Sequence, residues 1–276
     1  MVELRTGAAR VVLDEIHGGR VQRLVVDGQD LLVPPELDER NHGAFPMAPW
    51  AGRIRHGKFA FDGVEYALPC NQPPHAIHGI VRDRRWRVEE ASGAAAVLSV
   101  GLDAPWPFGG RVVQRAELTG DALALTLEVH AGDRPMPASC GWHPWWYRTP
   151  SPTAAALEVE LHADLQYVRD DEGIPNGELG PIRAPPWDDC FTQLGAPAAV
   201  LRWPATWTVR VETDCACVVV FTEPEHAVCV EPQSGPPNAF NLDPRVVTPD
   251  APLVVHTTFS WADARSSTPP ADARGR

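Results

Sequence analysis

The strongest constraint on the fold is a period-two alternation of apolar and polar residues that recurs along the chain. Between 121 and 130, apolar side chains occupy every second position: Leu123, Leu125, Leu127 and Val129. Successive side chains of a strand point to opposite faces, so this pattern is typical of a half-buried antiparallel strand. It recurs at 157–162, 207–212 and 253–261, whereas no segment keeps helical spacing over three turns. A mainly antiparallel β-structure is therefore predicted.

Turn signals separate these segments. Asp27-Gly28 and Asp62-Gly63 each stand between apolar runs, and Asp-Gly in that position is a strong hairpin signal. We therefore expect a meander over 9–33 and a hairpin over 58–68. The continuous apolar run at 217–221 predicts a strand covered on both faces, and 253–261 is expected to close the sheet.

Length and turn content together favour one large unit. The 276 residues include 29 prolines and 22 glycines spread along the chain, as many short strands require. We expect an all-β fold, two large antiparallel sheets packed as a β-sandwich or a barrel, in a single domain over 1–263. The polar, proline-bearing tail over 264–276 is expected to be disordered.

Charge and hydropathy limit the kinds of molecule that this protein is expected to bind. A net charge of −12 argues against nucleic acid, since no basic run compensates for it. The N-terminus lacks a signal core and no stretch reaches membrane-spanning length, so a cytoplasmic monomer or homodimer with no membrane partner is expected. A neutral small molecule fits this charge. An anionic one would need a local patch such as Arg82, Arg84 and Arg85, for which surface solvation is the alternative interpretation.

Two polar residues leave apolar loops in the N-terminal third. Arg53 follows the buried-looking stretch 45–50, and His78 ends a proline-rich loop at His78-Gly79. We expect both in loops at strand ends, where a rigid sheet can hold polar groups for a ligand. A role in bracing the loop is the alternative for His78.

His143 lies within an aromatic stretch, and Glu231 ends an apolar one. His143 is surrounded by the tryptophans and tyrosine of 140–147, which suits a sugar site because aromatic rings pack on the apolar face of a pyranose; a core histidine is the equal alternative. Glu231 is expected at the buried end of a strand, where burial perturbs a carboxyl pKa and makes it a general-base candidate. Capping the strand or fixing the loop is the alternative role for Glu231.

Asp188 and Asp189 form an acid pair in an expected loop, where such pairs are most often solvated.

The sequence lacks the residue spacings that are typical of metal sites, serine hydrolases and nucleotide-binding sites. There is no H-x-H or H-x-x-x-H for a compact metal site, and no G-x-S-x-G for a serine hydrolase. Nucleotide-binding glycine motifs are missing as well. We therefore predict no metal and no cofactor.

In this order the stretches resemble the aldose 1-epimerase (galactose mutarotase) family. The resemblance lies in Pro46-x-x-Pro49-x-x-x-Arg53-Ile54, Gly57-x-Phe59, His78-Gly79, His143-Pro144-aromatic, Asp188-x-Cys190-Phe191 and Glu231-Pro-Gln-x-Gly235. It implies a β-sandwich of the galactose mutarotase type and an isomerase that interconverts the α and β anomers of a hexose. It also implies the roles of single residues: His143 as catalytic acid, Glu231 as catalytic base, and Arg53, His78 and Asp188 as sugar ligands.

Two departures and two alternatives stay open at this point. Trp145-Trp146 stand where relatives often carry Tyr or Phe, so the width of the pocket is expected to differ. Of the two adjacent acids, Asp188 rather than Asp189 is taken as the sugar ligand. One alternative is a hexose-6-phosphate 1-epimerase in which Arg55 or Arg82 binds the phosphate. The other is a non-catalytic carbohydrate-binding sandwich.

Overall fold

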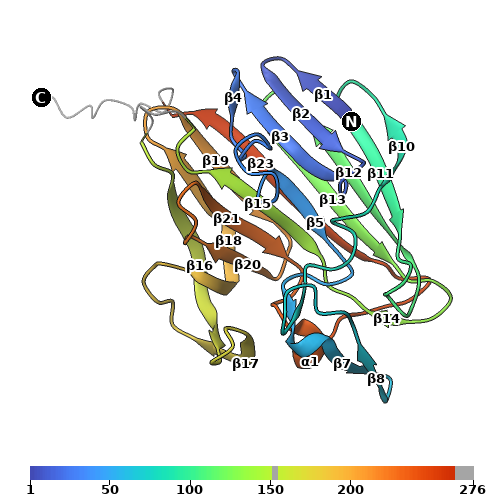
Figure 1. Ribbon diagram of the computed structural model, residues 1–276. Helices are drawn as coiled ribbons and strands as arrows, with labels where there is room; N and C mark the ends of the chain where they lie inside the picture. Colours follow the sequence, from blue (N-terminus) through green and yellow to red (C-terminus); the bar gives the residue numbers. More distant parts are fainter. Residues whose placement is uncertain (151–154, 265–276) are drawn as a thin grey trace, which may run out of the picture.

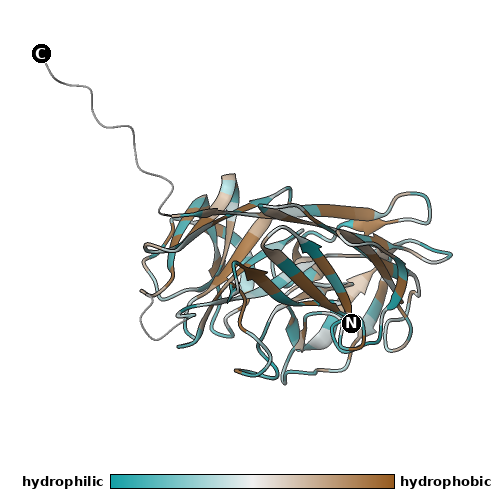
Figure 2. Ribbon diagram, turned by 90° about the horizontal axis from the view of Figure 1, so that it is seen from above, coloured by the Kyte–Doolittle hydropathy of each residue, from teal (hydrophilic) through white to brown (hydrophobic). Residues whose placement is uncertain are grey.

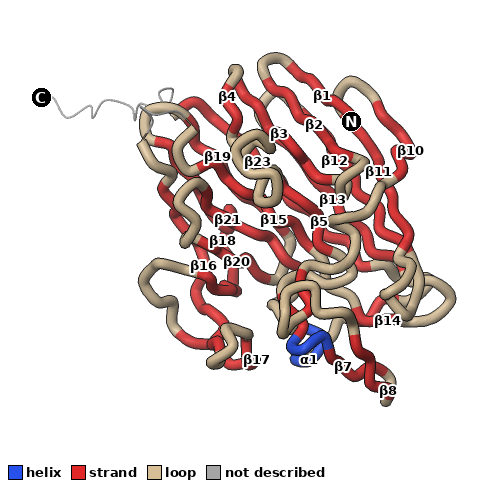
Figure 3. The backbone as a smooth tube through the Cα atoms, viewed as in Figure 1, coloured by secondary structure: helices blue, strands red, loops and turns tan. Residues whose placement is uncertain are grey.

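The computed structural model describes residues 1–150 and 155–264, and these are almost entirely strand (Figure 3). Within these ranges one hydrogen-bonded network contains 17 strands, all paired antiparallel, and three further two-stranded sheets flank it. The prediction of an all-β antiparallel fold is confirmed. Of the tail expected over 264–276, only Ala264 lies within the described residues.

The network forms two packed layers. Layer I contains, in spatial order, β1 (Val2–Thr6), β2 (Ala9–Asp14), β3 (Arg20–Val26), β5 (Ala44–Met47), β15 (Gly141–Tyr147), β21 (Ala227–Gln233) and β20 (Cys217–Phe221), with β4 (Gln29–Asp30) beside β3. Layer II contains β10 (Arg87–Ala91), β11 (Ala95–Gly101), β12 (Arg111–Leu118), β13 (Ala122–His130), β23 (Leu253–Asp263) and β19 (Trp207–Thr213).

Two long strands join the layers at one edge. The first half of β18 (Asp188–Trp203) pairs with β20 of layer I, and its second half pairs with β19 of layer II. Its neighbour β16 (Glu158–Arg169) follows it through both layers and carries β17 (Pro175–Gly180). The sandwich is thus one sheet folded over at β16 and β18, which explains why a single network contains both layers.

Smaller elements gather at one end of the layers (Figure 1). They are β6 (Arg53–Ile54) with β9 (Ala76–Ile77), β7 (Lys58–Phe61) with β8 (Val64–Ala67), β14 (Met136–Pro137) with β22 (Val246–Val247), the 3-10 turn Arg55–Gly57 and the helix α1 (Ala239–Leu242). None of the helices in the described ranges is long and apolar enough to cross a membrane.

Alternation along the strands decides which face meets the core. In β13 every second residue is buried, as predicted, and the largest buried cluster runs in sequence from Leu4 to Trp261. Apolar and polar stretches accordingly alternate along the ribbon (Figure 2). The strand predicted at 217–221 is buried on both faces, as expected. The strand expected to close the sheet, β23, lies instead inside layer II between β13 and β19.

Both predicted hairpin turns are confirmed. Asp27 and Gly28 have φ values of 48° and 79°, and Asp62 and Gly63 have values of 51° and 73°. Two successive left-handed residues produce a turn whose twist matches that of the flanking strands, and Asp-Gly adopts it at low cost. These turns fix the register of β3 with β4 and of β7 with β8.

One buried polar chain connects the layers through the core. Gln114 of β12 is fully buried; its Nε2 donates to the carbonyl of Gly19, 2.6 Å away, and its Oε1 accepts a hydrogen bond of 2.9 Å from Trp142 Nε1 of β15. Buried polar groups are costly unless paired. Gln114 therefore fixes layer II against the segment that leads into β3 and against β15.

Replacing this glutamine tests its role. Gln114→Leu keeps a similar volume but leaves a buried N–H and a buried carbonyl without partners, and we expect it to lower the free energy of unfolding by ~2–4 kcal/mol. Urea unfolding measures the change. In the double variant Gln114→Leu/Trp142→Phe the indole donor is gone as well, so the two effects should be less than additive. A Gln114→Leu protein as stable as the wild type would show that the link is dispensable.

Candidate active site

Three neighbouring strands of layer I place three side chains in a row. β15 pairs with β5 on one side, where His143 is opposite Phe45, and with β21 on the other. The register Gly141–Gln233 and Trp145–Cys229 places His143 opposite Glu231. Because alternate residues share a face, these side chains point away from the core that Trp142 and Trp146 enter. The row Phe45–His143–Glu231 thus lies on the outer face of layer I.

A cleft of about 1150 Å³ opens over this row. Loops and strand ends from separate parts of the chain form its walls, among them Arg20, Arg53, His78, Arg82, Arg169 and Asp188. Small-molecule sites typically occupy about 300–1,000 Å³. The cleft is therefore large enough for a monosaccharide with a substituent.

His143 and Glu231 form a buried pair at the floor of the cleft. His143 Nε2 lies 3.2 Å from Glu231 Oε1, and the two side chains are only 7% and 3% exposed. Gln233 Nε2 donates to Glu231 Oε2 at 3.1 Å. Burial, with the nearby guanidinium of Arg82, lowers the pKa of His143 to about 3. Burial and the carboxylate of Asp188 raise the pKa of Glu231 well above its ordinary value.

These opposite shifts have one consequence for the pair. Both groups favour their uncharged forms in a dry environment. The contact between them therefore holds one proton, which can be on His143 Nε2 or on the carboxyl group of Glu231. Protons of so closely coupled groups belong to the pair rather than to either residue. A base and an acid are thus available within one hydrogen-bonded unit.

Aromatic rings hold the imidazole of His143 in place. The ring of Phe45 stacks at a centroid distance of 4.8 Å and that of Trp145 also at 4.8 Å, while the ring of His78 meets it edge-on at 5.0 Å. Locked rings of this kind preorganise a catalytic group. Of the adjacent tryptophans singled out in the sequence, only Trp145 lines the cleft; Trp146 lies in the core.

His78 reaches the cleft from a strained loop. Its φ of 59° is left-handed, which is uncommon outside glycine, and its backbone N–H donates to the carbonyl of Gly52 at 2.9 Å. Gly79 follows with a φ of 71°, and a Cβ there would lie 1.9 Å from the carbonyl oxygen of Ala48. Only glycine permits this close approach. Burial and His143 lower the pKa of His78 well below its ordinary value, so its imidazole is neutral.

Arg53 and Asp188 lie together at the side of the cleft. Arg53 Nη1 is 3.9 Å from Asp188 Oδ2, and Arg169 Nη1 is 3.4 Å from the same oxygen. Asp189 is buried, also lines the cleft, and pairs with Arg169 Nε at 3.0 Å. In the pairing of β18, β20 and β21, Asp188 is in line with Phe221 and Cys229, whereas Asp189 is in line with Val220 and Val230 of the core. Asp188, about a quarter exposed, is thus the acid of the two that shares the face of Glu231.

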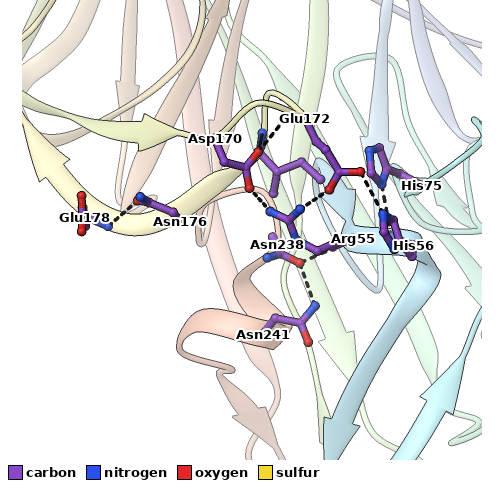
Figure 4. A network of polar contacts seen from close by, with 10 residues as sticks. Arg55, His56, His75, Asp170, Glu172, Asn176, Glu178, Asn238 and Asn241 are labelled. Atoms are coloured by element: carbon purple, nitrogen blue, oxygen red, sulfur yellow. Dashed lines mark hydrogen bonds and ion pairs between the residues drawn. The ribbon is translucent and has the colours of Figure 1, made fainter.

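A polar network fixes the loop that carries Arg53 (Figure 4). Asn238 donates its backbone N–H to the carbonyl of Arg53 at 2.6 Å and accepts the N–H of Arg55 on Oδ1 at 3.1 Å. The guanidinium of Arg55 binds both Asp170 and Glu172. Arg55 is therefore paired with two carboxylates and does not line the cleft. It cannot serve as the phosphate ligand expected from the sequence.

The five predicted site residues converge, but not as the sequence suggested. Arg53, His78, His143, Asp188 and Glu231 all line the one cleft. Arg53 and Asp188, both expected in loops, are instead the first residues of β6 and β18. Glu231, expected at the end of a strand, lies inside β21, and His143 lies inside β15. Proline and aromatic residues obscured these strands.

Other cleft residues were missed by sequence reasoning: Arg20, Phe45, Arg169 and Gln233. Gln233 could have been found, since it lies two residues beyond Glu231 and shares its face. Arg20 and Arg169 reach the cleft through tertiary contacts that leave no local signal.

Two clusters in the described ranges have the donor groups for a metal ion: His143, Cys229 and Glu231, and His56, His75 and Glu172, each with ligand atoms within 4.8 Å of one another. In the first, burial raises the pKa of the Cys229 thiol well above its ordinary value, which opposes the thiolate that metals bind. In the second, Arg55 already supplies positive charge to Glu172. Neither cluster favours a metal, and the expectation of none stays a prediction.

Several buried polar atoms along the cleft have no hydrogen-bond partner within residues 1–150 and 155–264. They are His78 Nδ1, His143 Nδ1, Trp145 Nε1, Gln233 Oε1 and Arg20 Nε. Buried polar groups are normally paired, and exceptions require an explanation.

Comparisons with known proteins identify the family of this chain. Residues 1–259 match the profile of the family described as aldose 1-epimerase. The chain is 26% identical over 254 residues to the uncharacterised protein YihR of Escherichia coli (strain K12), covering 81% of this chain and 80% of YihR. It is 28% identical to Homo sapiens galactose mutarotase over 144 residues, which are 50% of this chain and 42% of the mutarotase.

The fold agrees as well. A galactose mutarotase-like protein from Clostridium acetobutylicum superposes with a TM-score of 0.84 at 16% identity, over 95% of this chain and 94% of that one. Since the family profile covers nearly the whole chain, the chain belongs to the aldose 1-epimerase family.

Proposed function

We propose that this protein catalyses the interconversion of the α and β anomers of a hexose, as an aldose 1-epimerase. The observation that carries the proposal is the buried pair of His143 and Glu231, 3.2 Å apart, at the floor of a cleft with unpartnered polar atoms. Family membership supports an epimerase, and the similarity to galactose mutarotases supports a hexose.

The reaction opens and recloses the sugar ring. Glu231 takes the proton from O1 as C1 becomes a carbonyl carbon, the C1–O5 bond breaks, and O5 takes the proton of His143 Nε2. The aldehyde rotates about C1–C2, and O5 attacks its other face with the two roles exchanged. No step needs a cofactor. Each positioned acid or base typically contributes about 10²–10⁴-fold.

The pair begins this cycle with the one proton it needs. Ring opening uses the form in which the proton is on His143, and the positive guanidinium of Arg53 favours ionised Glu231. Arg53, His78 and Asp188 would hold the ring oxygen and hydroxyls. Neutral His78 can donate one hydrogen bond and accept another.

Removing either member of the pair tests the mechanism. Glu231→Gln and His143→Gln should each lower kcat for mutarotation of α-D-glucose or α-D-galactose about 10²–10⁴-fold, because one proton transfer is lost. Polarimetry against the spontaneous rate measures this, and circular dichroism checks the fold. Glu212→Gln, exposed on β19 in layer II, is the matched control and should stay active.

The outcomes separate the candidate functions. A folded Glu231→Gln protein with wild-type activity would remove Glu231 from the role of base. A wild type that binds hexoses but does not accelerate mutarotation would point to the carbohydrate-binding alternative.

The pKa shifts also predict how activity depends on pH. With ordinary values, the one-proton state of the pair would disappear above about pH 6.5, when the histidine loses its proton. Because the pKa of His143 is lowered to about 3 and that of Glu231 is raised, that state instead persists until Glu231 ionises. We therefore expect kcat/KM, corrected for the buffer blank, to stay level from pH 5.5 to above pH 6.5. A tenfold fall per pH unit above pH 6.5 would show that the pair loses its proton there and that the two pKa shifts do not extend the active range.

The choice of Asp188 over Asp189 can be tested with paired variants. Asp188→Asn should raise the KM for the sugar about tenfold, because a hydrogen bond from a hydroxyl to a charged acceptor is weakened. Asp189→Asn, which weakens the buried ion pair with Arg169, should instead lower the free energy of unfolding by about 1–3 kcal/mol and leave KM unchanged. The reverse pattern would assign the sugar contact to Asp189.

A further inference from the structure

Two arginines of the cleft wall lie over the ring of Phe45. Arg20 is the first residue of β3, and Arg82 follows the His78-Gly79 turn. Their guanidinium carbons lie 5.2 Å and 5.3 Å from the centroid of the Phe45 ring. Both line the cleft. We call these two side chains the guanidinium pair.

Arg20 is buried without a carboxylate partner. The side chain is 8% exposed, and Nη1 contacts the carbonyls of Arg40 and His42 at 3.3 Å and 2.8 Å and His42 Nδ1 at 3.1 Å. Among the described residues no carboxylate lies within ion-pair distance of it, and its Nε has no partner. Burial and Arg82 lower the pKa of Arg20 to about 10, so it stays charged at neutral pH.

The surrounding charges do not cancel this pair. Arg82 Nε lies 3.3 Å from Asp83, whose side chain is 77% exposed and solvated. Asp14 is opposite Arg20 in the pairing of β2 with β3, and the carboxylates of Asp14, Asp38 and Asp83 all favour the charged form of Arg20, but none of them forms an ion pair with it. His42 is neutral, because burial and Arg20 lower its pKa to about 4. Arg20 is thus a buried positive charge without an ion-pair partner among the described residues, and burying such a charge unpaired is costly.

The order of side chains along the row indicates which part of a sugar reaches the guanidinium pair. In the proposed reaction Glu231 acts on O1 and His143 on O5. O5 is bonded to C5, and C5 carries C6. The pairing of β3 with β5 places Arg20 opposite Phe45, so the row continues as Glu231, His143, Phe45 and Arg20. This row follows the order O1, O5, C5 and C6 along the edge of a pyranose.

We propose that the substrate is an aldohexose with an anionic group on C6, and that Arg20 and Arg82 bind this group. The inference rests on the proposed epimerase function and narrows its substrate class. A phosphate ester, a sulfonate or a carboxylate at C6 each offers at least two oxygens to guanidinium donors. Arg82, one of the two arginines expected from sequence to bind a phosphate, is thus retained in this role, and Arg55 is not.

Positional isomers of one charged sugar give the sharpest test. Anomer exchange is measured by two-dimensional exchange NMR with D-glucose 6-sulfate, D-glucose 3-sulfate and D-glucose. The 6-sulfate should have a kcat/KM at least about tenfold above both others, since hydrogen bonds between charged partners are worth that much or more. Its KM should also rise with ionic strength, because salt screens the attraction. Equal values for the 6- and 3-sulfates would overturn the proposal.

Variants assign the effect to the guanidinium pair. Arg82→Gln, at a half-buried loop position, should reduce the preference for the 6-sulfate over the 3-sulfate about tenfold or more. Arg85→Gln, which removes the same charge from an exposed residue three positions along, should keep the preference. An Arg82→Gln protein with an unchanged preference would overturn the assignment. D-glucose 6-phosphate, 6-deoxy-6-sulfo-D-glucose and D-glucuronate then show which anion binds best.

Binding separates this proposal from the proposed reaction. Calorimetric titration of the same sugars measures affinity whether or not they are converted. Tighter binding of the 6-sulfate that depends on Arg82, without anomer exchange, would support the anion site and overturn the epimerase activity. Anomer exchange of every sugar at similar kcat/KM, with no preference in binding, would support the epimerase and overturn the anion site.

Discussion

The pairing of β15 with β5 on one side and β21 on the other is the constraint on which the site depends. Antiparallel register puts His143 between Phe45 and Glu231, and a slip of one residue would turn the imidazole into the core. Both neighbours belong to a sheet that continues for many strands, so the register is fixed far beyond the site. The 3.2 Å contact of His143 with Glu231 is a product of sheet geometry.

Layer I carries two different surfaces on one set of strands. Its inner face packs Trp142, Trp146 and Val230 into the core, while its outer face presents His143, Trp145 and Glu231 to the cleft. Residues on both faces are buried, so these strands lack the apolar–polar alternation of β13. A rigid core on one side and locked aromatic rings on the other leave the side chains of His143 and Glu231 little freedom.

Burial also governs the electrostatics of the cleft. Uncharged forms are favoured at His143, Glu231 and His78, whereas Arg20 retains its charge because a guanidinium is a much weaker acid. His143 and Arg20 lie on the two strands next to β5, so the ring of Phe45 stands between the uncharged imidazole and the buried positive charge. Arg53 places a further positive charge near Glu231.

The sequence by itself determined the fold class and the chemistry-bearing residues. Alternation, as at Leu123 to Val129, and Asp-Gly turns are local signals set by the two-residue period of a strand and by backbone sterics. The motifs around Arg53, His78, His143, Asp188 and Glu231 also stand in the chain itself. Only the tertiary structure decided that the stretch around His143 is a strand, that Asp188 rather than Asp189 faces Glu231, and that Arg20 joins Arg82 beside Phe45. Those facts depend on pairing between distant segments, which no local pattern records, because strand register and burial are properties of the assembled sheet.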